Sequence, residues 1–180
     1  MTDSLMSAIT AAVTAGRDGD TDHARAALLA IWNQAPTPEA GYRCVLAHYL
    51  ADLYDHPAEA LIWDTRALDA AHDLTDAELS SVLPGGTVAA LRPSLHLNLA
   101  DQLRRLGAFD GAAEHVAAAR THLSALAADS YGEWIRALGE QVAAAVAARD
   151  SAPLRSSADP TAASSVAPER ATPGPAGGPP

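Results

Sequence analysis

The chain has no lysine, and arginine supplies all twelve of its basic residues. Against them stand 22 aspartates and glutamates, so the formal net charge is −10. A negative surface repels a phosphate backbone, and no basic cluster stands out beyond the pair Arg104 and Arg105. We therefore expect no nucleic acid among the partners.

Cysteine and long apolar runs are also scarce. The single cysteine, Cys44, has no second thiol with which to form an internal disulfide. The first ten residues, MTDSLMSAIT, lack a basic leader, and no apolar stretch approaches the roughly 18 to 20 residues that span a bilayer. These absences predict a cytoplasmic protein that has no membrane partner.

Aromatic residues make up only 4% of the chain, although the hydrophobic class reaches 48%. Small residues, alanine above all, and leucine therefore supply most of that class. Alanine is the best helix former and a poor strand former, which argues against sandwiches, barrels and parallel sheets. The composition predicts an all-α fold, and a length of 180 residues suits about one domain.

The composition changes near Asp150. Residues 151–180 hold seven of the twelve prolines and almost no large apolar side chains. Such a stretch buries too little surface to offset its ordering entropy. We expect a helical-repeat domain over residues 1–149 and a disordered Pro/Ala/Ser/Gly-rich tail over residues 150–180, with nothing beyond Arg149 packed on the body.

Turn signals divide the domain into about seven helices that pair as hairpins, with one further short helix. Pro38 and Pro93 are expected in the first turns of helices, and Asp20 or Thr21 is expected to cap one. The short helix opens with a capping box, Thr75 to Glu78, and a second box starts at Ser130. The remaining boundaries are Gly107, which ends a helix, and Asp110, which caps the next one.

Two neighbouring helices carry a recognisable pattern. The helix that contains Leu99 and Ala100 is followed by the turn glycine Gly107, and the small residue Ala112 comes five positions later. Small residues allow the two helices of a hairpin to cross closely. The pattern resembles the tetratricopeptide repeat, whose unit is about 34 residues.

The same pattern recurs upstream, where Leu50-Ala51-Asp52 repeats Leu99-Ala100-Asp101. We count three degenerate repeats over residues 3–126, closed by a capping helix. The chain is similar to small tetratricopeptide-repeat proteins of high-GC bacteria, and the resemblance implies a right-handed solenoid of antiparallel hairpins. Other α-solenoids and plain helix bundles contain similar hairpins and remain alternatives.

The resemblance also implies a concave groove lined by the first helix of each pair. Tyr49 and Asp52 should face it in one repeat, and Asn98 and Asp101 in the next. Asn98 stands where peptide-binding members carry an asparagine that hydrogen-bonds an extended peptide, and Arg104 is the basic residue expected nearby. The alternative is that Asn98 bonds within the helix layers. The two aspartates favour a basic or neutral segment as ligand.

A possible metal set is formed by Cys44, His48 and Asp52, which lie at i, i+4 and i+8 on one helix face. The sequence has no CxxC or HExxH to support it, so a packed cysteine beside a surface histidine is the preferred interpretation. We therefore expect no cofactor and no enzymatic activity.

These inferences predict a non-enzymatic adaptor or scaffold that binds a protein or peptide segment in its groove. Two alternatives stay open. One is a structural homo-oligomer, in which an exposed face of the last helix with Trp134 or Val146 packs against a second copy. The other is a metal-dependent enzyme that uses Cys44, His48 and Asp52.

Overall fold

The computed structural model describes residues 2–34 and 39–154. This part of the chain contains α-helices, one short 3-10 helix and no strand, which confirms the predicted all-α class. The elements are α1 (Thr2–Arg17), α2 (Thr21–Trp32), α3 (Ala40–Ala51), α4 (Pro57–Ala70), α5 (Asp76–Val82), α6 (Val88–Arg105), α7 (Phe109–His122), η1 (Leu123–Ala125) and α8 (Ser130–Ala147). Most of the expected tail, residues 155–180, lies outside the described residues.

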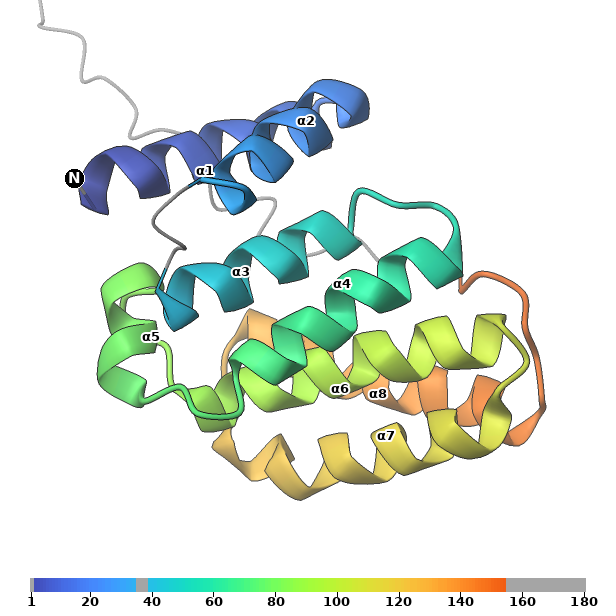
Figure 1. The fold of residues 1–180 in the computed structure, drawn as a ribbon. Helices are drawn as coiled ribbons and strands as arrows, with labels where there is room; N and C mark the ends of the chain where they lie inside the picture. The colour runs from blue at the N-terminus through green and yellow to red at the C-terminus, as the bar shows by residue number, and fades with distance from the viewer. Residues whose placement is uncertain (1, 35–38, 155–180) are drawn as a thin grey trace, which may run out of the picture.

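Consecutive long helices pair as hairpins. α1 packs with α2, α3 with α4, and α6 with α7, and Figure 1 shows these three pairs one above another. Between the pairs, α2 contacts α3 and α4 contacts α6, while α8 lies against both α6 and α7. None of the described helices combines the length and apolarity that crossing a membrane requires.

Local signals place several helix ends where the sequence predicts them. Thr75 and Glu78 form the capping box of α5, since each side chain bonds the other residue's backbone N–H. Asp20 caps α2 by accepting from the His23 backbone N–H. Gly107 follows α6 at φ 81°, a left-handed conformation that glycine adopts without steric cost. Such interactions span only a few residues, so they can be predicted from local sequence.

The predicted start of α6 at Pro93 is wrong. The helix begins at Val88, and Pro93 lies inside it. Thr87 caps this earlier start by accepting from the Ala90 N–H, and Asp76 of α5 accepts from the Val88 N–H at 2.7 Å. The Asp76 contact joins two separate helices, so local sequence does not reveal it.

Two other predicted caps are displaced by one or two residues. α7 begins at Phe109, which places Asp110 in its first turn instead of at the cap. The cap of α8 is Asp129, which accepts from the Gly132 N–H at 2.8 Å, so Ser130 is the first helical residue. Pro38, expected in the first turn of α3, lies outside the described residues.

Two apolar cores lie on opposite sides of α6. The first joins α1 to α5 and includes Leu95, and the second joins α6, α7 and α8 and includes Leu97. Residues two positions apart on a helix point in nearly opposite directions, which explains how α6 serves both cores. The predicted contact residues Ala100 and Ala112 are fully buried in the second core.

The chain continues past α8 as a packed C-terminal segment, residues 150–154. It turns back at Arg149, whose φ is 52°, and Leu154 packs against the second core. The backbone carbonyls of Asp150 and Ala152 accept hydrogen bonds from Arg104 of α6. The prediction that nothing beyond Arg149 packs on the body is therefore wrong.

Candidate functional site

A pocket of about 370 Å³ opens beside α6, α8 and the end of α3. Three of the predicted groove residues line it, namely Asp52, Asn98 and Asp101. The other lining residues are Leu97, Gln102, Arg105, Trp134, Leu138, Val142, Pro153 and Leu154. We call this opening the α6–α8 pocket. It brings together residues that the sequence places in two different repeats.

The α6–α8 pocket has one polar wall and one apolar wall. Asp52 and Asp101 contribute carboxylates to the polar wall. On the other wall, Trp134, Leu138 and Val142 follow one another at four-residue intervals, so they form a stripe along α8. A ligand that combines a positive charge with apolar surface suits such a lining.

Asn98 is half-buried at the rim between the pocket and the interior. Its Nδ2 lies 3.3 Å from Asp64 Oδ1 and 3.4 Å from His48 Nδ1. The side-chain amide therefore bonds residues of α4 and α3, within the helix layers. This is the alternative that the sequence left open for Asn98.

Asp64 is fully buried in α4, behind the polar wall of the pocket. Burial raises the pKa of its carboxyl to about 8, and the negative charge of Asp52 adds to that effect. The nearby side-chain amides of Asn98 and Gln102 lower the pKa and offset part of the rise. With a pKa of about 8, Asp64 is mostly protonated at neutral pH, and its Oδ2 has no hydrogen-bond partner among the described residues.

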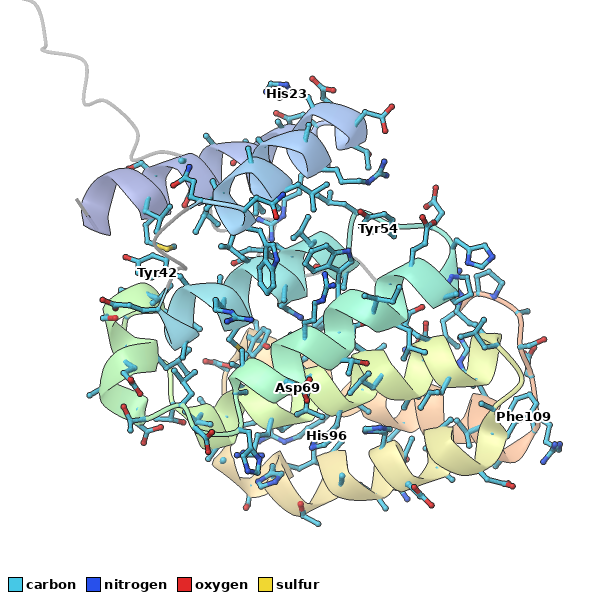
Figure 2. The ribbon with its side chains drawn as sticks, in the orientation of Figure 1. His23, Tyr42, Tyr54, Asp69, His96 and Phe109 are labelled. Carbon is cyan, nitrogen blue, oxygen red and sulfur yellow. The ribbon has the colours of Figure 1, made fainter. Side chains whose placement is uncertain are left out.

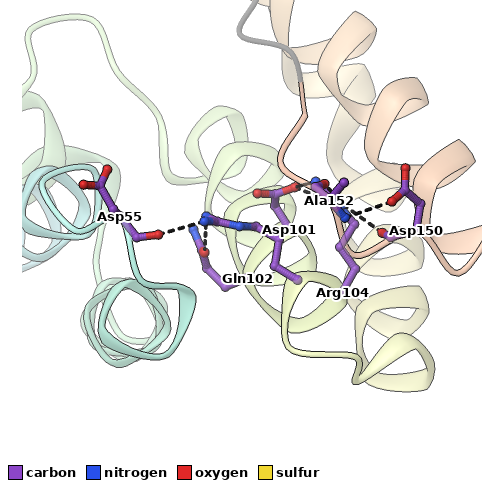
Figure 3. Close-up of polar contacts among 7 residues, drawn as sticks. Asp55, Asp101, Gln102, Arg104, Asp150 and Ala152 are labelled. Atoms are coloured by element: carbon purple, nitrogen blue, oxygen red, sulfur yellow. Dashed lines mark hydrogen bonds and ion pairs between the residues drawn. The ribbon is translucent and has the colours of Figure 1, made fainter.

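Arg104 does not face the pocket as predicted, because its side chain is fully buried. Nε donates to Asp101 Oδ1 at 2.8 Å, and Nη1 donates to the carbonyls of Asp150 at 2.9 Å and Ala152 at 2.7 Å (Figure 3). These bonds attach the C-terminal segment to α6. Arg104 is therefore a structural residue that also orients the pocket residue Asp101.

The next residue, Arg105, is the basic side chain that lines the pocket. Its guanidinium donates to Gln102 Oε1 at 3.2 Å and to the Asp55 carbonyl at 2.7 Å (Figure 3). The second bond joins α6 to the turn before α4. Arg105 thus fixes the edge of the pocket on the side of Asp52.

Tyr49, the remaining predicted groove residue, lies apart from the pocket lining. It is half-buried against the first core, with its ring centroid 5.9 Å from that of His48. The structure therefore brings together three of the five predicted residues and places Tyr49 and Arg104 elsewhere.

The possible metal set does not form a shared site. Cys44 is fully buried and burial raises the pKa of its thiol to about 12, whereas Asp52 is exposed at the end of α3. A thiol that stays protonated is a poor metal ligand. Among the described residues, no group of three or more His, Cys, Asp or Glu side chains could hold a metal ion.

A second opening of about 430 Å³ lies between α4 and α6, with Asp69 and His96 in its lining (Figure 2). His96 Nδ1 lies 3.0 Å from His115 Nδ1 of α7. Burial lowers the pKa of both imidazoles, that of His96 to about 4, so the pair is neutral at pH 7. A hydrogen bond between two neutral rings accounts for this contact.

One of the two residues expected on an exposed face of α8 is buried within the chain. Val146 belongs to the second core, and Trp134 lines the α6–α8 pocket with its ring 6.2 Å from that of Tyr131. This contradicts the predicted exposure of Val146 on a free helix face.

Sequence reasoning missed Asp64, the stripe of α8 as a pocket wall, and the C-terminal segment. The four-residue spacing of Trp134, Leu138 and Val142 is readable from the sequence, but the element that the stripe faces is not. Asp64 carries no local signal, because a buried aspartate looks like any polar residue on a helix.

Comparisons with family models, with curated proteins and with solved structures find no match to the chain. The geometry and charge of its own residues therefore carry the functional argument.

Proposed function

We propose that the protein is a non-enzymatic interaction module whose helix hairpins stack as a tetratricopeptide-like solenoid. In this proposal the α6–α8 pocket binds an extended segment of a partner protein through a basic side chain. The observation that carries it is the lining of the pocket, which combines the acidic residues Asp52 and Asp101 with an apolar stripe of α8.

The order of helix contacts supports the stacked arrangement. Each of the three hairpins packs internally, and neighbouring hairpins meet through α2 with α3 and α4 with α6. α8 then covers α6 and α7 as a closing helix. Stacked hairpins of this kind leave surfaces along which an extended chain can lie.

The two walls of the pocket support a basic ligand. The aliphatic stem of an arginine or lysine can lie on Trp134 and Leu138 while its charged end approaches Asp52 and Asp101. The net charge of −10 adds a long-range attraction for cations. Asn98 acts in this proposal as a positioning residue, because its Nδ2 is already bonded to Asp64 and His48.

Titration of the full chain into a fluorescein-labelled peptide tests the proposal. The probe contains one arginine between two leucines, and in the matched peptide glutamine replaces the arginine. We expect the arginine peptide alone to raise the fluorescence anisotropy, with an affinity that falls as salt increases.

The matched variants are Asp52→Asn in the pocket and Asp55→Asn outside it. Asp55 lies three residues after Asp52, and its side chain is exposed and does not line the pocket, so the second variant removes an equal charge from a neighbouring position. Asp52→Asn should weaken binding about two- to fivefold, as expected for an exposed ion pair, and Asp55→Asn should leave it unchanged. Equal effects of the two variants, or equal binding of the two peptides, would contradict the proposed pocket.

A further inference from the structure

A second charged surface, of opposite sign, is built on α2, α3 and α4. Trp32 and Trp63 meet edge to face with their ring centroids 5.1 Å apart. The Arg43 guanidinium carbon lies 5.1 Å from the Trp32 ring, and that of Arg66 lies 4.3 Å from Trp63 and 5.8 Å from Trp32. We call these four residues the Arg–Trp cluster. It shares no residue with the α6–α8 pocket.

Both arginines of the Arg–Trp cluster are exposed, and neither pairs with a carboxylate in the described part of the chain. Glu39 and Asp69 are the nearest candidates by helical spacing, four residues before Arg43 and three after Arg66. Neither lies within ion-pair distance, and Asp69 lines the opening beside His96 instead (Figure 2). Two exposed guanidiniums, neither paired with a carboxylate of residues 2–34 or 39–154, thus lie beside one aromatic pair in a chain of net charge −10.

A position over an aromatic ring restrains a guanidinium and so helps it to bind an anion. The attraction to the ring uses none of the N–H donors in an ion pair, so these donors remain available to a ligand. A carboxylate matches two of those donors at once, which gives both strength and direction. Ile62, 53% exposed, lies one helical turn before Arg66 and adds apolar surface beside the charges.

We infer that the Arg–Trp cluster binds two carboxylates of an acidic segment in a partner protein. The arginines supply two forked donors that lie around one Trp32 ring, so neighbouring acidic side chains of a single extended segment can reach both. The acidic remainder of the chain repels the same segment, which confines it to this surface. With the proposed basic ligand of the α6–α8 pocket, the protein then presents two sites of opposite charge preference.

The test uses the full chain and a fluorescein-labelled peptide with two adjacent glutamates followed by leucine, amidated at its C-terminus so that only side-chain carboxylates are present. Arg43→Gln and Arg66→Gln should each weaken binding about five- to tenfold. The control Arg120→Gln removes an equal charge from an exposed side chain of α7 and should leave affinity within about twofold of the parent chain. Equal weakening by all three variants would overturn the inference.

Two further comparisons separate recognition from general attraction. Arg66→Lys keeps the charge but loses the planar fork, so it should recover only part of the affinity lost in Arg66→Gln. Full recovery, or tighter binding of an oligodeoxythymidylate than of the peptide through the same arginines, would overturn the assignment. Asp52→Asn should not weaken the acidic peptide, which makes this result independent of the α6–α8 pocket.

Discussion

Two regions at α6 each bury one ionisable side chain completely, Arg104 in one and Asp64 in the other, but only Arg104 has partners that compensate its charge. Arg104 bonds the carboxylate of Asp101 and two backbone carbonyls of the C-terminal segment. Asp64 holds one amide contact at 3.3 Å, and its Oδ2 lacks a partner of good geometry among the described residues. The Arg104 guanidinium is thus paired with a carboxylate and with carbonyl acceptors, whereas the carboxyl of Asp64 has a pKa raised to about 8.

The difference shows what decides the state of a buried charge. Removal from water costs several kcal/mol for either group, and only hydrogen bonds or opposite charges offset that cost. Arg104 receives both, so it remains charged and joins two parts of the chain. Burial of Asp64, with the like charges of Asp52 and Asp101 adding to it, raises its pKa so that it takes up a proton instead.

We expect the largest loss of stability in the variant Arg104→Met, which removes the paired cation of this comparison. The variant leaves Asp101 and two carbonyls without their donor, which should lower the free energy of unfolding by about 3 kcal/mol. Urea unfolding followed by circular dichroism measures the loss. Arg120→Met, on an exposed side chain, is the control and should change stability by less than about 0.5 kcal/mol. A loss equal to that of the control would show that the Arg104 bonds contribute nothing.

Removal of the carbonyl partners instead of the arginine should have a smaller effect. A chain that ends after Arg149 loses both acceptors of Arg104 and the apolar contact of Leu154. We expect a loss of about 2 kcal/mol and a lower melting temperature, because hydrogen bonds to a charged group disappear. A chain that ends after Leu154 keeps these contacts and is the matched control. Equal melting temperatures for the two truncations would restore the sequence-based expectation that nothing beyond Arg149 packs.

The smallest of the three effects, at most about 1.4 kcal/mol between pH 7 and 8, sharpens the comparison through pH. The unfolded chain releases the Asp64 proton near pH 3.8, whereas the folded chain keeps it up to about pH 8. Between these two values the folded chain therefore holds one more proton than the unfolded chain. The free energy of unfolding therefore falls as pH rises, by up to about 1.4 kcal/mol per pH unit. The lowered pKa of His96 has the opposite effect, but it acts between about pH 4 and its ordinary value of 6.5.

Stability measured between pH 7 and 8 therefore reports mainly on Asp64, because the His96 and His115 imidazoles are mostly neutral there in the folded and unfolded chain alike. In Asp64→Asn the pH dependence in this range should disappear, because an amide cannot release a proton. Cys44→Ser changes another buried group, whose pKa of about 12 lies outside the range, so it should keep the parent slope. The same slope in Asp64→Asn and the parent chain would assign the titration to another residue.

Much of the fold can be predicted from local features. Alanine content predicts helices, and Asp20, Thr75 and Gly107 mark three of their ends because a cap or turn acts within a few residues. Pro93 misleads because the Thr87 cap and the Asp76 contact from α5 start α6 five residues earlier.

The candidate site is predictable only in part. Asp52 and Asp101 occupy equivalent places in two repeats, and the structure puts both in one pocket. Arg104 stands three residues after Asp101 and would be expected to share its exposure, but the C-terminal segment covers it. A feature that depends on which element packs over a helix has no local signature.

The sequence by itself determined the helical class, several of the helix ends and the excess of negative charge. Only the tertiary structure decided that Arg104 is buried and paired, that Asp64 is buried and mostly neutral, and that Asn98 bonds across helices. Asn98 contacts Asp64 and His48, and Arg104 contacts Asp150, over 34, 50 and 46 residues of sequence. Helix propensity and capping act between neighbours, whereas burial and charge state depend on whatever distant residues the packing brings together.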